Sequence, residues 1–366
     1  MEVIAIIVGV VMVLTVLMDM INTLVTTTTS RGRWWLTVVL YTRTWAFVRS
    51  AGQRIGNDRR RERFYSAYAP ISVLGLLCAW VAQQLVGFGL IWWGIGGVDG
   101  AASLGDALYY SGVVYFTLGF GEIVPIDVVP RFGALVEAFA GVLTTALVIG
   151  YLPALYSAYS EREQKLLTLD DGTEDRITPT NLVLSRSPEG DPRELDAFFQ
   201  EWEAWVAQVM ETHTTFPMLV VFRSQHPGQS WITALGLVTD AALHMEIMEG
   251  SQGRAPYWMM RRSTRLLQML TEGHDLTAYR QARDERLEGG DPALFRELYD
   301  RLESRGFPLM PFEEALVHSA ALRSRYDAEL EYLIDMLAAP RGFWGHAIGY
   351  RIDEETASSR REPSSE

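Results

Sequence analysis

Three stretches of this chain are long and apolar enough to cross a lipid bilayer: residues 3–25, 69–93 and 132–156. A membrane-spanning helix needs about 20 consecutive apolar residues. Asp19 and Asn22 are the strongly polar interruptions of the first stretch. Because bilayer hydrocarbon offers no hydrogen-bonding partner, each stretch must satisfy its backbone internally and is expected to be an α-helix. The sequence therefore predicts a mainly α-helical membrane protein, with residues 1–30 as its N-terminal transmembrane helix.

The segment 31–65, between the first two apolar stretches, is strongly basic. It carries nine arginines against two acidic residues, Asp58 and Glu62. Short arginine-rich loops stay on the cytoplasmic side of a membrane. Three crossings of the plasma (inner) membrane would then place the N-terminus outside and the C-terminal region in the cytoplasm.

Residues 34–48 within this basic segment are expected to form an amphipathic helix at the cytoplasmic interface. The alternative is that residues 34–48 span the membrane. The N-terminus would then lie on the cytoplasmic side, and the topology of the rest of the chain would be unchanged. At the other end of the second apolar stretch, Trp92 and Trp93 are expected to lie in the outer aromatic belt of the membrane.

Charge divides the chain into two regions. Residues 1–160 carry ten arginines and nine acidic residues, a net charge of +1. Residues 161–366 carry 22 basic and 36 acidic residues, a net charge of −14. An acidic surface argues against nucleic acid as a partner, because phosphate binding requires a basic one. The single cysteine, Cys78, excludes an intrachain disulfide.

The C-terminal region is expected to contain a linker, a helical domain and a tail. Residues 157–167 (SAYSEREQKLL) are expected to continue the third helix as a charged extension. Turn-forming residues in DDGTED and SPEGDP then indicate a turn-rich stretch over 170–191, within the linker expected over 161–191. Helical spacing of apolar residues predicts an all-α cytosolic domain over 192–340, followed by a flexible tail over 341–366. One face of its first long helix is expected to be buried: Leu195, Phe198, Phe199, Trp202, Trp205, Val206 and Val209. Further helices are expected over 230–248, 257–270, 276–287, 292–303 and 312–337.

The C-terminal region contains no recognisable order of nucleophile, acid and base, so we expect neither an enzyme nor a cofactor. Candidate ligands for a metal site are His213, His226 and His244, together with Glu246 and Glu249. Residues two apart on a helix point in different directions, however, which separates residues 244 and 246. We therefore expect no metal beyond a permeating cation. The polar stretch 222–231 (FRSQHPGQSW) is the candidate contact for an unidentified cytosolic regulatory ligand.

Between the second and third apolar stretches lies the short motif TLGFGEIVP, residues 117–125. Ser103 and Asp106 predict a capped start for a helix of about three turns that ends near residue 116. Such a helix is too short to cross a bilayer. Non-helical backbone at membrane depth is tolerated only where it is buried in protein or lines a water-filled path. The sequence therefore predicts a re-entrant pore loop.

Residues 117–121 of this loop suit the coordination of a dehydrated cation. Backbone carbonyls can replace the water that the cation loses, without the strong trapping of a carboxylate. Gly119 and Gly121 can adopt the positive φ that points successive carbonyls toward one axis, and Thr117 can add a hydroxyl oxygen. Leu118 and Phe120 are expected to point away and pack against the short helix. One loop supplies one side of a ring, so a homotetramer is expected.

The motif GFGE-x-x-P, placed after a short helix and between two spanning segments, resembles the pore module of potassium channels over roughly residues 70–160. The resemblance implies an outer helix, pore helix, filter and inner helix over 66–160. It implies that the selectivity filter is formed by Thr117, Leu118, Gly119, Phe120 and Gly121. It further implies that Glu122 is the acid of the outer mouth and Gly141 the gating hinge of the inner helix.

Four residues depart from the pattern of that family. Phe120 stands where tyrosine is usual, Glu122 where aspartate is usual, and Leu118 where valine or isoleucine is commoner. Phe116 stands where a second threonine is common. Backbone carbonyls do not depend on these side chains, so conduction is expected to survive. The departures bear on selectivity, and sodium is a second candidate ion beside potassium.

The third apolar stretch contains five further candidate residues. Glu137 could be a functional carboxylate, or it could support the filter by a hydrogen bond to the back of the pore helix. Thr144 and Thr145 could line a cavity or bond to carbonyls one turn back. Gly150 and Pro153 are expected to kink the helix near its cytoplasmic end.

The sequence thus predicts a tetrameric channel for a monovalent cation, potassium in the first instance, whose inner helix is coupled to a cytosolic domain. The alternative is a non-conducting or poorly selective pore scaffold. In that case the cytosolic domain would be the working part, as a receptor or partner-binding module.

Overall fold

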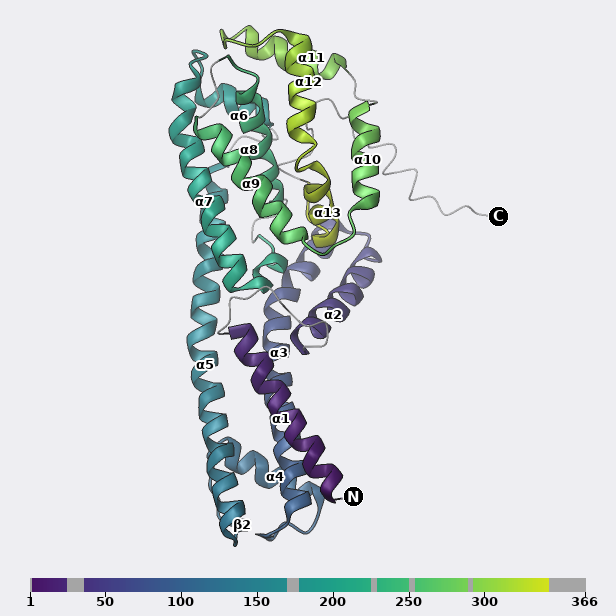
Figure 1. Cartoon of the computed structure of the whole chain (residues 1–366), viewed down its shortest axis with the longest axis vertical. Coiled ribbons are helices and arrows are strands. Elements are labelled where there is room, and N and C mark those ends of the chain that lie inside the picture. Colours follow the sequence, from purple (N-terminus) through teal and green to yellow (C-terminus); the bar gives the residue numbers. More distant parts are fainter. Residues whose placement is uncertain are drawn as a thin grey trace, which may run out of the picture. The chain divides into compact units, whose positions relative to one another are not determined.

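A computed structural model describes residues 2–24, 36–169, 178–224, 229–249, 254–288 and 292–341. The chain is mainly α-helical, as predicted (Figure 1). It divides into two compact units. The N-terminal unit comprises Met1–Tyr159 and His213–Phe222, and the C-terminal unit comprises Ser160–Thr212 and Arg223–Glu366.

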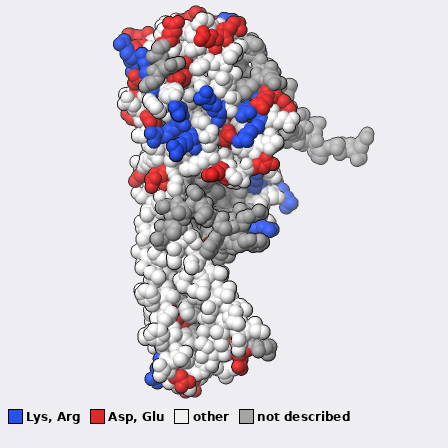
Figure 2. All heavy atoms as spheres, viewed as in Figure 1, with Lys and Arg blue, Asp and Glu red and all other residues white. Residues whose placement is uncertain are grey.

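In its described residues, the segment Met1–Tyr159 of the N-terminal unit contains five helices and one small pair of strands. In chain order they are α1 (Glu2–Leu24), α2 (Leu36–Gln53), α3 (Asp58–Ile95), β1 (Val98–Asp99), α4 (Leu104–Tyr115), β2 (Val124–Pro125) and α5 (Val128–Leu166). The strands are antiparallel, with Val98 opposite Pro125. Within the described residues, three helical segments are long and apolar enough to span a membrane, Glu2–Thr23, Arg59–Ile95 and Val128–Leu169, and they coincide with the three stretches predicted to do so. Figure 2 shows almost no charged side chains over α1.

Helix α1 packs along α3 through closely apposed glycines. A Cβ atom on Gly9 would lie 2.4 Å from the carbonyl oxygen of Gly87, so the two backbones approach each other there. Small residues permit such close helix packing within membranes. At the other end of α1, the buried Asp19 carboxylate accepts hydrogen bonds from the Thr37 hydroxyl (2.8 Å) and the Trp80 indole (2.8 Å). Asp19 therefore joins α1 to α2 and α3.

The C-terminal unit is entirely helical in its described part. Besides the end of α5 and most of α7 (Asp196–Thr215), its helices are α6 (Pro179–Arg186), α8 (Trp231–Glu246), α9 (Ala255–Thr271), α10 (Thr277–Glu288), α11 (Pro292–Glu303), α12 (Phe312–Arg323) and α13 (Asp327–Leu337). Short 3-10 turns lie at Leu167–Leu169 and Pro192–Leu195, while the 3-10 turn Pro217–Val221 belongs to the N-terminal unit. Every residue of α8 is buried, so α8 is the central helix of the unit. The seven apolar residues predicted to line the first long helix are all buried, as expected.

Two stretches differ from the expected organisation. The stretch 161–191, expected as a linker, contains the helix α6, which Thr178 caps, whereas the end of α5 at Leu166 confirms the predicted continuation of the third helix. The single helix expected over 312–337 is interrupted between α12 and α13. The expected tail, 341–366, lies outside the described residues except for Arg341.

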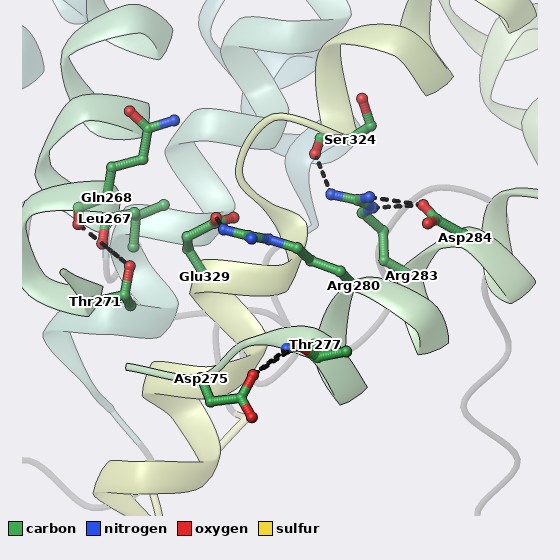
Figure 3. A network of polar contacts seen from close by, with 10 residues as sticks. All are labelled: Leu267, Gln268, Thr271, Asp275, Thr277, Arg280, Arg283, Asp284, Ser324 and Glu329. Atoms are coloured by element: carbon green, nitrogen blue, oxygen red, sulfur yellow. Dashed lines mark hydrogen bonds and ion pairs between the residues drawn. The ribbon is translucent and has the colours of Figure 1, made fainter. Parts of the chain in front are cut away.

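The interruption between α12 and α13 is held by tertiary contacts (Figure 3). Arg283 of α10 donates a hydrogen bond to the Ser324 carbonyl at 2.9 Å, and Arg280 pairs with Glu329 at 3.2 Å. The buried Tyr326 hydroxyl donates to Asp240 of α8 at 2.5 Å. Because the helix is interrupted here, the Tyr326 side chain points into the core. The residues that hold the interruption, Arg283 and Asp240, lie far from it in sequence.

Candidate functional site

The predicted short helix is α4, and its start is fixed by a capping box. The Ser103 hydroxyl accepts from the Asp106 amide, and the Asp106 carboxylate accepts from the Ser103 amide at 2.8 Å. This confirms the predicted cap. Twelve residues at 1.5 Å each give a helix of roughly 18 Å, which is shorter than the ~30 Å hydrocarbon core of a bilayer.

The backbone after α4 alternates in handedness through the predicted filter. Thr117, Gly119 and Gly121 have φ angles of 54°, 63° and 85°, whereas Leu118 and Phe120 do not have positive φ. The positive φ predicted for the two glycines is confirmed. Such alternation turns successive peptide planes over and can bring their carbonyls to one side of the chain.

Thr117 ends α4 in a Schellman motif. The Leu118 amide donates to the Val113 carbonyl at 2.8 Å, and the Thr117 amide donates to the Val114 carbonyl at 3.0 Å. The left-handed position of such a motif usually holds glycine. A β-branched residue there costs about 1–2 kcal/mol, and strain of this kind collects at functional sites. Sequence reasoning missed it, because the motif is visible only once the helix end is known.

Leu118 and Phe120 do not pack against α4, so that prediction is wrong for the single chain. Leu118 is 54% exposed and Phe120 is 64% exposed, and Phe116 beside them is exposed as well. The buried face of α4 is occupied instead by packing against α3 and α5, through residues such as Ala107 and Tyr110. Phe116, Leu118 and Phe120 thus form an exposed apolar patch. A patch of this kind is expected to be covered by a further protein surface.

The loop beyond the filter is fastened to the ends of α3 and α4. The Tyr109 hydroxyl of α4 donates to the Glu122 carboxylate. The Ile126 amide donates to the Gly97 carbonyl at 3.1 Å, next to the β1–β2 pair. Glu122, the predicted outer-mouth acid, is exposed. The residues 117–121 are thus anchored at both ends.

Glu137 joins three helices behind the filter. Its buried carboxylate accepts from the Trp92 indole of α3 at 2.6 Å and from the Ser111 hydroxyl of α4 at 2.5 Å. The expected hydrogen bond to the back of the pore helix is therefore present. Trp92 is buried, and its ring packs edge-on against Tyr110, so its predicted place in the outer aromatic belt is wrong.

Gly141 lies where α5 passes the end of α4. A Cβ atom at this position would lie 2.0 Å from the Tyr115 carbonyl oxygen. Glycine is therefore required here for close packing of two backbones, whatever its role as the predicted hinge.

We expect Gly141→Ala to destabilise the N-terminal unit by about 1–3 kcal/mol or more, because α5 must move away from α4. Gly150→Ala is the matched control on the same helix, since no atom lies within 4 Å of a Cβ at residue 150. Alanine is favoured over glycine in helices by up to about 1 kcal/mol, so the control should be neutral or stabilising. Thermal unfolding in detergent measures both, and equal melting temperatures for the two variants would contradict the packing argument.

The remaining candidates on α5 differ from one another. Thr144 is buried, accepts from the Gln84 side chain at 3.3 Å and donates to the Ala140 carbonyl at 2.8 Å. Of the two alternatives for Thr144, the bond to a carbonyl one turn back is therefore the one present, and its side chain faces α3. Thr145 is exposed and donates to the Gly141 carbonyl, and its cavity role stays a prediction. Gly150 is exposed and Pro153 lies inside α5, and the kink there also stays a prediction.

Within the described residues, no cluster of three or more metal-binding side chains occurs. His226 and the centre of the stretch 222–231 lie outside the described residues. His244 is fully buried on α8, and neither ring nitrogen has a hydrogen-bond partner.

The buried His244 should make the C-terminal unit sensitive to acid. Burial, assisted by the charge of Arg323, lowers the pKa of His244 to about 3. The unfolded chain takes up this proton below its ordinary pKa of about 6.5, so the stability is complete above about 6.5 and falls as the pH drops toward 3, by up to about 1.4 kcal/mol per unit. We expect His244→Leu to flatten this dependence, measured by urea unfolding of the full chain. His318→Leu, at a half-buried position, is the control. An unchanged slope in His244→Leu would contradict the assignment.

Comparison with known proteins places an ion channel domain over residues 75–157, which match the family described as "Ion channel". This region contains most of α3, all of α4 and α5 as far as residue 157. Residues 75–157 therefore form an ion-channel pore domain, and a further helical region follows it.

The chain is also similar to the Uncharacterized membrane protein YdjJ of Bacillus subtilis (strain 168). The two are 28% identical over 144 residues, which is 38% of this chain and 40% of the relative. The chain thus covers less than half of that protein's length. No solved structure matches this chain.

Proposed function

We propose that four copies of this chain form a channel for a monovalent cation, potassium, with the carbonyls of residues 117–121 as its ligands. The observation that carries the proposal is the alternation of φ at Thr117, Gly119 and Gly121 directly after a short, capped helix. Carbonyl oxygens that converge on an axis replace an ion's hydration shell. One chain supplies one such strand, and a closed ring requires several.

The exposed side chains of the filter support assembly. Phe116, Leu118 and Phe120 lie uncovered in a single chain. Neighbouring subunits arranged around an axis would cover them, as rings of identical subunits bury complementary surfaces. The same arrangement would direct the negative end of the α4 dipole toward the conduction path.

The C-terminal unit is the proposed regulator of the pore. Its residues from 161 onward carry a net charge of −14, which would raise the local cation concentration at the cytoplasmic mouth. Helix α5 runs from the pore domain into this unit without interruption. A ligand that binds the unit could therefore act on the inner helix. The nine arginines of residues 31–65 support a cytoplasmic location for that side.

The test is ion flux through purified protein in liposomes, with reversal potentials measured under mixed potassium and sodium. The proposal expects a reversal potential that follows the potassium gradient. A potential near zero with equal currents would identify a poorly selective pore. Absence of flux from protein of verified tetrameric mass would favour the scaffold, in which the C-terminal unit acts alone.

A further inference from the structure

Helix α2 and the start of α3 form a hairpin that lies outside the matched pore domain. Aromatic residues fix the two helices to each other. Trp45 packs on Tyr65 and Tyr68 with ring centroids 5.8 and 5.0 Å apart, and the Tyr65 hydroxyl donates to the Arg49 carbonyl at 3.2 Å. A Cβ on Gly52 would overlap the Tyr65 ring, so α2 and α3 are in close contact.

The outer faces of this hairpin combine arginine with exposed phenylalanine. On α2, Arg43 and Phe47 are exposed one turn apart, and Phe47 is 73% exposed; the exposed Arg54 directly follows the end of α2. On the first two turns of α3, the exposed arginine and phenylalanine side chains are Arg59, Arg60, Arg63 and Phe64. These five arginines form no ion pair and no side-chain hydrogen bond within the described part of the chain. We call this set of seven residues the basic hairpin face.

The basic hairpin face lies at the end of a membrane span. The apolar part of α3 begins near residue 69, six residues after Arg63. Six residues correspond to roughly 9 Å of helix, while the headgroup layer on each side of the hydrocarbon is about 5–8 Å thick. Arginine side chains extending from this position reach the phosphate groups. Trp45, which is half-buried, is of the kind that marks the membrane–water interface.

We infer that the basic hairpin face binds the phosphate headgroups of anionic phospholipids, with Phe47 and Phe64 inserted among the acyl chains. The net charge of the hairpin indicates which class of lipid it binds. Residues 36–68 carry seven arginines against Asp58 and Glu62, a net charge of +5. A lipid with a net negative headgroup neutralises these arginines, whereas a zwitterionic lipid does not. The exposed phenylalanines favour a lipid surface over a soluble phosphate.

The inference does not depend on ion conduction, so the two can fail separately. The test uses the full chain in uncharged detergent, and native mass spectrometry measures bound phosphatidylglycerol and phosphatidylcholine with equal tails. We expect at least a tenfold preference for phosphatidylglycerol, since each arginine near a surface contributes about 1 kcal/mol. The triple variant Arg59→Gln/Arg60→Gln/Arg63→Gln should lose at least tenfold in affinity for phosphatidylglycerol.

Two matched variants separate the effect of the arginine charge from the effect of its position in the chain. Arg59→Lys/Arg60→Lys/Arg63→Lys keeps the charge and should stay within threefold of the wild type. Arg261→Gln/Arg265→Gln removes exposed arginines from α9 of the C-terminal unit and should leave lipid binding unchanged. If the triple glutamine variant does not fold, Arg43→Gln/Arg54→Gln, on α2 and directly after it, replaces it, with a loss of at least threefold expected.

Three results would overturn the inference. The first is equal affinity of the wild type for the two lipids. The second is undiminished phosphatidylglycerol binding by the glutamine variants. The third is displacement of the lipid by millimolar glycerol phosphate, because it would identify a soluble phosphate as the natural occupant of the site.

Discussion

Gly119→Ala is expected to reduce potassium flux to below about 1% of the wild-type level. Gly119 has a φ of 63°, and an L-residue with a Cβ atom pays about 1–2 kcal/mol in that conformation. Four copies in one ring would together disfavour the conducting arrangement by roughly 4–8 kcal/mol, where about 1.4 kcal/mol is a factor of ten. Flux from liposomes, normalised to the amount of protein inserted, measures the effect.

Gly75→Ala is the matched control for this variant. Gly75 lies inside α3 with ordinary helical φ, and no atom lies within 4 Å of a Cβ placed there. The potassium flux of Gly75→Ala should equal that of the wild type. If Gly119→Ala and Gly75→Ala conduct equally well, the backbone of residue 119 does not shape the conduction path.

Glu137→Ala is expected to produce a large loss of stability in the pore domain. It leaves the buried Trp92 indole without its acceptor, whereas the Ser111 hydroxyl keeps the Leu85 carbonyl at 3.0 Å. An unsatisfied buried group costs about 1–3 kcal/mol, and the cavity left by the side chain adds to this. A melting temperature measured in detergent should therefore fall well below that of the wild type.

Two comparisons sharpen this second prediction. Glu122→Ala removes an exposed carboxylate from the same domain and should cost less than about 1 kcal/mol. Trp92→Phe combined with Glu137→Ala should cost less than the sum of the single variants, because both remove the same bond. Additive costs would mean that Trp92 and Glu137 act independently, against the contact described.

Local chemistry was readable from the sequence where a residue's own neighbours decide its conformation. The cap formed by Ser103 and Asp106, the positive φ of Gly119 and Gly121, and the three spanning helices all depend on short stretches of chain. The buried face of α7 follows from helical spacing in the same way.

Features that depend on residues far away in the sequence could not be predicted from the sequence. Trp92 turns inward because Glu137, 45 residues later, accepts its indole hydrogen. Thr144 faces α3 because Gln84 donates to its hydroxyl. The break at Ser324–Tyr326 depends on Arg283 and Asp240. Thr117 adopts a left-handed conformation against its own preference, because the end of α4 and the course of the filter require it.

A density map of the full chain in lipid nanodiscs with potassium, reconstructed without imposed symmetry, tests the central proposal most directly. The account predicts four copies around one axis, with the carbonyls of Thr117–Gly121 directed at ion density on that axis. A map in which Gly119 and Gly121 face lipid or bulk solvent, or in which the copies do not converge there, would contradict it.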